Sequence, residues 1–352
     1  MRSSGPAIIS HPGPTVSACT ERELIDRIRQ RLAPPPPWVS VGIGDDAAVV
    51  EVERNRLEVL SVDAVVEGVH FDRSLSPAAA IGHRALAVNL SDLAAMGATP
   101  RLALLSMALP GEFPLADFDG IADGVAALAA ATSTHVVGGN LTRTPGPLTI
   151  EITVVGTVKP RRALTRGGAR EGDELYVTGT IGAARTGLEI LRAAHPTAMH
   201  QTHAVYESCV ARYQRPEARL RVGVLLARNR VASACVDLSD GLADAVRQIA
   251  DGSSVGVEIQ ADLLPVDPGA RAWFESRGAD PERSALEAGD DYELLFAVRP
   301  RLRRRLNAIA RLFDVPITRV GVCTAGRGAT LLRTDGPVSR AIDLPRGYGH
   351  FR

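Results

Sequence analysis

Aspartates recur within the most apolar segments of this chain, where a buried strand or helix would ordinarily carry no charge. Five sites show the pattern: Asp45-Asp46 in VGIGDDAAVV, Asp63 in LSVDAVV, Asp92 in ALAVNLSDLAAMG, Asp237 and Asp240 in CVDLSDGL, and Asp290-Asp291 in EAGDDYELL. Converging carboxylates repel by a few kcal/mol per close pair at an effective dielectric constant of about 20, so such a set requires cations. Oxygen ligands without histidine or cysteine favour Mg²⁺, which commonly accompanies phosphates. The pattern therefore predicts a magnesium site assembled from several strand and helix ends.

Each acidic position also has a simpler interpretation when it is taken alone. Asp92 follows Asn89 by three residues on one face of an alanine-rich helix, and the pair also fits a polar helix face that touches a loop. Ser239 or Asp240 fits the N-cap of the helix that follows the strand ending near Asp237. Capping does not require carboxylates at all five sites, so the set as a whole favours the metal site.

The composition describes a globular protein without a preference for nucleic acid. The 352 residues suffice for about two domains, 45% are hydrophobic, and 40 basic residues balance 40 acidic ones. The four cysteines are widely separated, which argues against zinc and disulfides and favours a reducing cytoplasm. No window reaches the roughly 18 apolar residues of a membrane span. We therefore expect a cytoplasmic protein without membrane or nucleic-acid partners.

Strand and helix signals follow one another in two mixed α/β halves. In the first half, the sequence predicts strands at 57–66, at RLALLSMALP, at THVVGGN and at 149–158, and helices at 77–97 and 115–132. In the second half, it predicts strands at ELYVTG, CVDL, VGVEIQ, YELLFAV and ITRVGVC, and helices near 183–194 and 217–228, after CVDLSDG and at RPRLRRRLNAIARLF. A polar, glycine-containing stretch at 159–173 separates the halves. We predict a flexible arm at 1–20, a first domain at 21–160 and a second domain at 161–352.

Acidic strand ends together with glycine-rich turns suggest ATP-dependent phosphoryl transfer, in which the protein positions and neutralises the phosphates. Such turns occur at GGN, residues 138–140, and at Gly42 and Gly44. Lys159 is the only lysine and no P-loop motif exists. Gly42, Gly44 and Ala47, with Asp63 about twenty residues on, also match a dinucleotide-binding fingerprint. That alternative is disfavoured, because the acidic pair after Gly44 would point at a pyrophosphate and the following residues open a helix poorly.

Eight motifs occur in the order found in thiamine-monophosphate kinases, and the chain resembles this family from about residue 21 to its end. They are GIGDDAAVV, SVDAVVEGVHF, ALAVNLSDLAAMGATP, GGNLTRTPGPL, RALTRGGAREGDELYVTG, VDLSDGLADAV, AGDDYELLF and GYGHF. The resemblance implies an N-terminal ATP- and magnesium-binding domain, whose strands form a helix-flanked β-barrel across a homodimer, and a C-terminal α/β domain. It also implies direct transfer of the ATP γ-phosphate to thiamine monophosphate, which yields thiamine diphosphate with several Mg²⁺ ions and no phosphoenzyme.

The resemblance also implies roles for individual residues. Catalytic, magnesium-binding carboxylates fall at Asp46, Asp63, Asp92, Asp237 and Asp240, and Ser61, Val62 and Asn140 are further implied metal contacts. Gly139, Asn140, Arg166 and Ser239 fall where the family contacts ATP. His70, Asp290 and Tyr348 are implied to bind the thiamine phosphate, with Tyr348 stacking on an aromatic ring.

Three positions depart from the pattern of the family. Asn140 replaces a usual aspartate, so an amide without charge stands where a carboxylate would bind metal. Val62 replaces a usual threonine and offers only its backbone carbonyl, and Asp290 is one methylene shorter than the usual glutamate. We expect an active enzyme with weakened affinity at one Mg²⁺. The alternatives are a degenerate homologue that binds nucleotide or thiamine phosphate without turnover, and an aminoimidazole-ribonucleotide synthetase of the same superfamily.

The adjacent carboxylates of VGIGDDAAVV need separate roles if this segment is extended, because successive side chains of a strand point to opposite faces. We assign the metal contact to Asp46 and a secondary role to Asp45.

Overall fold

The computed structural model describes residues 13–193, 204–335, 338–347 and 349. Its first half contains η1 (Val16–Ala18), α1 (Glu21–Arg31), β1 (Val39–Val41), β2 (Val49–Val50), β3 (Leu57–Val66), α2 (Ala78–Ala95), β4 (Thr99–Pro110), α3 (Leu115–Thr132), β5 (His135–Thr144) and β6 (Thr149–Val158). The predicted strands at 57–66 and 149–158 and the helix at 115–132 have these bounds, and the helix predicted at 77–97 is α2.

The second half contains β7 (Glu174–Thr178), α4 (Ala183–Ala193), α5 (Ala204–Gln214), α6 (Leu220–Asn229), β8 (Ala232–Asp237), α7 (Leu242–Ser253), β9 (Gly256–Gln260), η3 (Ala261–Leu263), α8 (Pro268–Ser276), α9 (Pro281–Glu287), β10 (Leu294–Val298), η4 (Pro300–Leu302), α10 (Arg303–Ala310), β11 (Ile317–Thr324), β12 (Gly328–Asp335) and β13 (Val338–Asp343). Helices α5, α8 and α9 were not predicted. Asp267 and Asp280 cap α8 and α9, each followed by proline at the first helical position, which is a start signal that the sequence contains.

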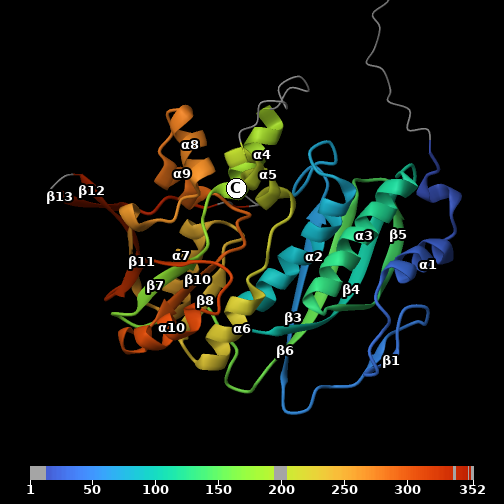
Figure 1. Cartoon of the computed structure of the whole chain (residues 1–352), viewed down its shortest axis with the longest axis horizontal. Coiled ribbons are helices and arrows are strands. Elements are labelled where there is room, and N and C mark those ends of the chain that lie inside the picture. The colour runs from blue at the N-terminus through green and yellow to red at the C-terminus, as the bar shows by residue number, and fades with distance from the viewer. Residues whose placement is uncertain (1–12, 194–203, 336–337, 348, 350–352) are drawn as a thin grey trace, which may run out of the picture.

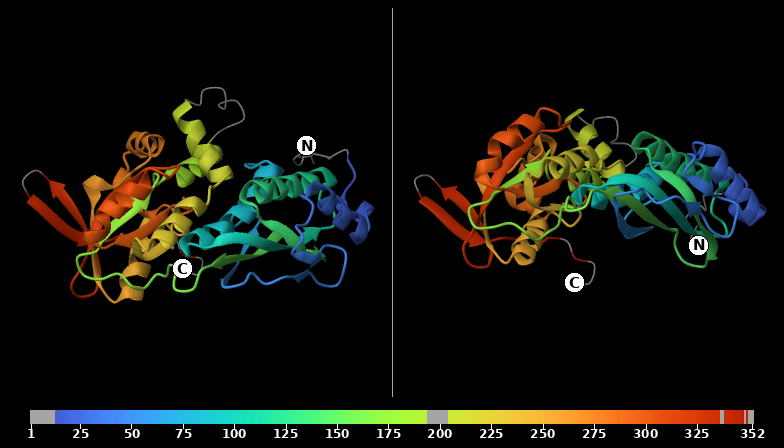
Figure 2. Two further views of the ribbon diagram at one scale, coloured as in Figure 1. Left: turned by 60° about the horizontal axis from the view of Figure 1, so that its bottom comes forward. Right: turned by 90° about the horizontal axis from the view of Figure 1, so that it is seen from below.

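A four-stranded sheet in the order β3-β6-β4-β5 organises the first half, and α2 and α3 cover one of its faces (Figures 1 and 2). Alternate residues of β4 and β6, such as Leu105 and Ile152, are buried beneath these helices. The opposite face keeps apolar side chains in contact with solvent: Leu60 is 65% exposed, Val62 54% and Leu104 39%. Within the described part of the chain this sheet stays open, with β3 and β5 as its edges.

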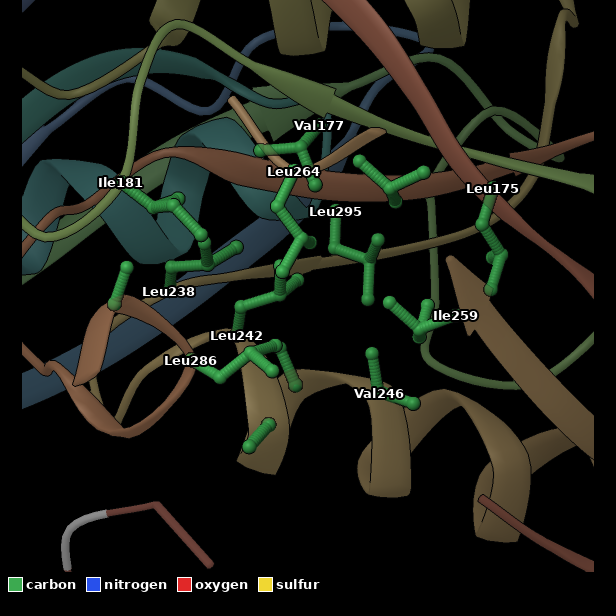
Figure 3. Close-up of a cluster of buried hydrophobic side chains, with 14 of the residues drawn as sticks. Leu175, Val177, Ile181, Leu238, Leu242, Val246, Ile259, Leu264, Leu286 and Leu295 are labelled. Carbon is green, nitrogen blue, oxygen red and sulfur yellow. The ribbon is translucent and has the colours of Figure 1, made fainter. Parts of the chain in front are cut away.

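A seven-stranded sheet in the order β13-β12-β9-β11-β7-β10-β8 organises the second half. Figure 3 shows its core, where Val177 and Leu295 from the strands meet Leu242 and Val246 from α7. These two strands and one helix bury the four side chains almost completely, and β8 pairs with β10, so the C-terminal end of β8 is held at a fixed position.

The two halves share packed surface, because α6 of the second half lies directly against α2 of the first. A Cβ added to Gly223 in α6 would lie 1.9 Å from the Ala94 carbonyl oxygen of α2, so only glycine permits this approach. Ala94 and Ala95 belong to the same buried cluster as Val222 and Leu226. Helix α2 is therefore fixed relative to β8, and both carry predicted site residues.

The N-terminal segment is partly packed where the sequence predicts a flexible arm at 1–20. The Val16 side chain is buried and its N–H donates to the Phe113 carbonyl at 2.9 Å. Thr20 and Glu23 form a capping box at the start of α1, which satisfies backbone N–H groups of the helix. Residues 15–20 therefore belong to the body of the first half.

No helix in the part of the chain that the structure describes combines the length and apolar character of a membrane span.

Candidate active site

The last turns of α2 fix two of the predicted carboxylates. Asn89 is fully buried, and its Oδ1 accepts a hydrogen bond of 2.9 Å from the Asp63 N–H in β3. Its Nδ2 donates to the Ala85 carbonyl at 3.0 Å, which anchors the amide within α2. Asp92 accepts a hydrogen bond from the hydroxyl of Ser61, also in β3. The Asn89–Asp92 spacing therefore places β3 and α2 carboxylates beside one another.

The same part of α2 also reaches the second half of the chain. The Ser91 hydroxyl is buried and donates to Asp237 Oδ2 at 2.7 Å, at the end of β8. Asp92 therefore lies between Asp63 and Asp237, and three carboxylates from two sheets and one helix form a cluster. The interpretation of Asp92 as a residue that touches only a loop is wrong.

Charge repulsion and burial act together on this carboxylate cluster of Asp63, Asp92 and Asp237. Burial and the neighbouring charges of Asp92 and Asp240 raise the pKa of Asp63 to about 6. Burial and the Asp92 charge raise the pKa of Asp237 to about 7, and burial also raises the pKa of Asp92. The Arg166 cation opposes the increase at Asp92 and Asp237. Such a cluster favours binding of a cation, which removes the repulsion.

The junction between β8 and α7 presents Ser239 and Asp240 without using them as helix caps. Gly241 occupies the N-cap position with φ 95°, and no side chain caps the helix there. The Ser239 carbonyl accepts the Asp290 N–H at 2.8 Å, which ties this junction to the loop before β10. The capping interpretation of Ser239 and Asp240 is therefore wrong, and Asp240 contributes negative charge beside Asp63.

The acidic pair of VGIGDDAAVV lies on an exposed loop. Only β1 and the two residues of β2 are extended, and residues 42–48 connect them. Asp45 Oδ1 accepts the Asp46 N–H at 2.8 Å, so the first carboxylate stabilises the turn that presents the second. The segment is therefore not extended through the acidic pair, and the glycines at positions 42 and 44 and the alanines at positions 47 and 48 are compatible with a turn there.

A groove of about 1270 Å³ lies between this loop, α1 and the exposed face of the four-stranded sheet. Asp45, Asp46, Gly139, Asn140 and Glu151 line it. A Cβ at Gly139 would lie 1.7 Å from the Leu105 carbonyl oxygen, so this glycine is required for close pairing of β5 with β4. Asp46 and Asn140 thus line the same groove.

The groove and the carboxylate cluster are separate places in one chain. Asp63 lies in a cross-strand row with Ile152, Leu105 and Gly139, next to Asn140. Three strand spacings separate the ends of this row by about 14 Å. Ligands of one Mg²⁺ lie about 2.1 Å from the ion, so Asp63 and Asn140 of one chain cannot share it.

Two of the three residues predicted to bind the acceptor are held by hydrogen bonds. His70 Nδ1 accepts the Val66 N–H at 3.1 Å, which assigns the ring proton to Nε2. Asp290 Oδ1 lies 2.6 Å from a terminal nitrogen of Arg84. Tyr348 lies outside the described residues, and Gly347 before it approaches the Asp240 carbonyl so closely that a Cβ would lie 2.4 Å away.

Across the described residues, no three or more histidine, cysteine, aspartate or glutamate side chains are arranged to hold a metal ion by themselves. Mg²⁺ is commonly bound by one or two carboxylates with water and substrate phosphates, so separate carboxylates with hydroxyl neighbours still fit this ion. Ser61 lies with Asp63 on the helix-covered side of β3, whereas the Val62 side chain lies on the exposed face. Val62 therefore has only its carbonyl to offer.

Sequence reasoning missed two buried polar residues beside the site. Ser91 contacts Asp237, and Arg84 contacts Asp290. Arg84 was detectable as the one arginine within the largely apolar α2. Ser91 gave no signal, because a serine next to Asp92 is equally compatible with an unpaired helix position.

Comparison with known proteins assigns the chain to a class. Profiles of the AIR synthase related protein, N-terminal domain and C-terminal domain, match residues 44–158 and 170–333. The molecule is therefore a two-domain, mixed α/β protein of the AIR synthase related class.

Relatives that match over nearly the full length narrow this class to one family. Thiamine-monophosphate kinase of Escherichia coli (strain K12) is 37% identical over 338 residues, which cover 95% of this chain and 99% of that protein. The crystal structure of thiamine-monophosphate kinase from Stenotrophomonas maltophilia K279a has 38% identity and a TM-score of 0.79, covering 88% of this chain and 96% of that one. A structure of AaThiL complexed with AMPPCP and TMP has 31% identity and a TM-score of 0.74, covering 94% and 97%. The chain belongs to the thiamine-monophosphate kinase family.

Proposed function

We propose that this protein is a thiamine-phosphate kinase, a phosphotransferase with a phosphate group as acceptor, which uses ATP to convert thiamine monophosphate into thiamine diphosphate. The carboxylate cluster of Asp63, Asp92 and Asp237 carries the proposal, because its raised pKa values and oxygen-only chemistry suit magnesium-bound phosphates. Full-length similarity to thiamine-monophosphate kinases and to a homologue bound to AMPPCP and TMP supports this acceptor and donor.

Asp63, Asp92, Asp237 and Asp240 would hold Mg²⁺ at the cluster, together with the Ser61 hydroxyl and the Val62 carbonyl. Bound Mg²⁺ would neutralise charge on the transferred phosphoryl group and orient it. Arg166 supplies a positive charge to the same cluster and would contact ATP with Ser239 and Gly139. The protein residues thus position the donor, and the reaction needs no phosphoenzyme.

A second magnesium position would use Asp46 and Asn140 in the groove. The separation of about 14 Å between the strands of Asp63 and Asn140 supports an ion distinct from those of the cluster. The neutral Asn140 amide makes this the weaker position, since it lacks the Coulomb attraction of a carboxylate.

The acceptor would be bound by His70, Asp290 and Tyr348. With its proton on Nε2, His70 is suited to donate to a phosphate oxygen. Asp290 belongs to the loop tied to Ser239, so acceptor and donor contacts lie on connected segments.

We also propose that two copies pair through the exposed sheet face with Leu60, Val62 and Leu104, so that their strands complete a β-barrel. The domains would divide near residue 160, with the dimer contacts in the first and the ATP and magnesium contacts supplied by both. The four cysteines are free thiols, which is consistent with a location in the reducing cytoplasm. Sedimentation of the protein as a monomer would contradict the pairing.

Incubation of the purified protein with ATP, Mg²⁺ and thiamine monophosphate tests the activity, with thiamine diphosphate and ADP as expected products. Binding of ATP and thiamine monophosphate without product would identify a degenerate homologue. ATP-dependent formation of aminoimidazole ribonucleotide, without thiamine diphosphate, would identify an aminoimidazole-ribonucleotide synthetase.

A further inference from the structure

The loop before β10 holds two residues in a backbone conformation that residues other than glycine rarely adopt. Asp290 has φ 69° and Tyr292 φ 49°, and a positive φ is a true outlier for a bulky residue such as tyrosine. Such residues persist only where surrounding contacts hold them, and they concentrate at binding sites. The loop is braced by the Asp291 carboxylate, which accepts the N–H groups of Gly182 at 2.7 Å and Ala184 at 3.2 Å.

Arg84 braces the same loop from the other half of the chain. This α2 residue is 3% exposed, and its guanidinium binds Asp290 Oδ1 at 2.6 Å. Another of its nitrogens donates to the Tyr213 carbonyl at 2.7 Å, and the group lies 5.0 Å from the centre of the Tyr213 ring. The planar guanidinium group binds the Asp290 carboxylate and the Tyr213 carbonyl at the same time, and a lysine ammonium is less well suited to hold both.

The contact with Arg84 fixes one oxygen of the Asp290 carboxylate, and this also sets the direction in which the other oxygen points. Oδ1 also accepts the Tyr292 hydroxyl at 3.1 Å, so both protein contacts of the carboxylate converge on a single oxygen. The side chain of Asp290 is 35% exposed, whereas that of Arg84 is 4% exposed. The partly exposed carboxylate is therefore anchored through Oδ1, which leaves Oδ2 as the oxygen that a ligand can contact.

We propose that Arg84 is a positioning residue for the acceptor: by anchoring Oδ1 of Asp290, it directs Oδ2 toward the cationic thiamine moiety. This inference rests on the proposed kinase activity. A buried ion pair contributes weakly to net stability compared with apolar packing, so geometry is the better reason for an arginine here. The effect of Arg84 should then fall on binding of the acceptor and leave binding of ATP unchanged.

The test compares Arg84→Met, Arg84→Lys and the double variant Arg84→Lys/Asp290→Glu with the unmodified protein. Steady-state KM values for both substrates are measured, with calorimetric Kd values for thiamine monophosphate and melting temperatures. Arg219→Met is the matched control, since Arg219 is equally buried but pairs with Glu293. We expect Arg84→Met to raise the KM and Kd for thiamine monophosphate about tenfold, as for one hydrogen bond to a charged group, and to leave the KM for ATP within about twofold.

The double variant separates positioning from a purely structural role. Glutamate extends the carboxylate by one methylene toward the shorter lysine, so Arg84→Lys/Asp290→Glu should recover most of the affinity that Arg84→Lys loses. Arg219→Met should lower the melting temperature without changing the ratio of the two KM values. Equal changes in both KM values, or no recovery in the double variant, overturn the proposal. If the unmodified protein binds no thiamine monophosphate, the kinase assignment itself fails; if it binds and Arg84→Met binds equally well, only the role of Arg84 fails.

Discussion

Replacement of Ser91 by alanine should weaken magnesium binding in a manner that depends on pH. The Ser91 hydroxyl donates to Asp237 at 2.7 Å in a buried site, and this bond lowers the pKa that burial and the Asp92 charge raise to about 7. A hydrogen bond to a charged group contributes about 1.5 kcal/mol or more, which corresponds to about one pKa unit. Without the hydroxyl, the pKa of Asp237 should therefore increase further.

The magnitude follows from the fraction of Asp237 that is ionised. At pH 7 a group with a pKa of about 7 is half ionised, and an increase of about one unit leaves about a tenth ionised. Because Mg²⁺ binds the carboxylate, its apparent affinity at pH 7 should fall about fivefold in Ser91→Ala. At pH 9 the carboxylate is ionised in both proteins, so the difference should nearly vanish.

Calorimetric titration of Mg²⁺ at pH 7 and pH 9 measures this effect. Ser74→Ala is the control, because it removes a serine–aspartate hydrogen bond of 2.6 Å at an exposed position remote from the cluster. An unchanged affinity in Ser91→Ala, or an equal loss at both pH values, would refute the reasoning.

Three further changes give independent checks. Asn140→Asp adds a carboxylate to the groove and should lower the Mg²⁺ concentration for half-maximal turnover; an unchanged magnesium dependence would contradict the weak second position. Glu293→Gln removes the charge of a fully buried glutamate that binds Arg219 at 2.7 and 2.6 Å and Thr178 at 2.6 Å, and urea unfolding should show a loss of about 3 kcal/mol. A loss below about 1 kcal/mol would be inconsistent with this estimate. Without Mg²⁺, Asp237→Asn should match the unmodified protein in stability below about pH 4, exceed it increasingly between pH 4 and 7, and keep a constant advantage above pH 7, because over that range the unfolded state releases a proton that folded Asp237 retains; a difference independent of pH would exclude this linkage.

Regular elements with strong local signals could be predicted from the sequence. β-branched residues and flanking turns defined β3 and β6. Pro114 and Ser133 are the residues immediately before and after α3. The carboxylate cluster could also be anticipated, because the simpler interpretations of single aspartates do not account for Asp63, Asp92 and Asp237 together in apolar surroundings. These inferences needed only neighbours along the chain and the cost of buried charge.

Features that depend on distant contacts could not be predicted. The pairing of Arg84 with Asp290 and of Ser91 with Asp237 arises only when α2 packs between the two halves. The apolar residues of VGIGDDAAVV are compatible with an extended segment, and they do not reveal that β2 contains only two residues. The separation of Asn140 from Asp63 likewise follows from strand order, which the sequence does not contain.

Tracing the labelled γ-phosphate of ATP tests the proposed reaction most directly. The protein is incubated with γ-labelled ATP, Mg²⁺ and thiamine monophosphate, and protein and thiamine products are separated. Direct transfer predicts that the label appears in thiamine diphosphate, that none remains on the protein, and that Asp92→Asn abolishes the labelled product. Label on the protein, or ADP formation without labelled thiamine diphosphate, would contradict the mechanism.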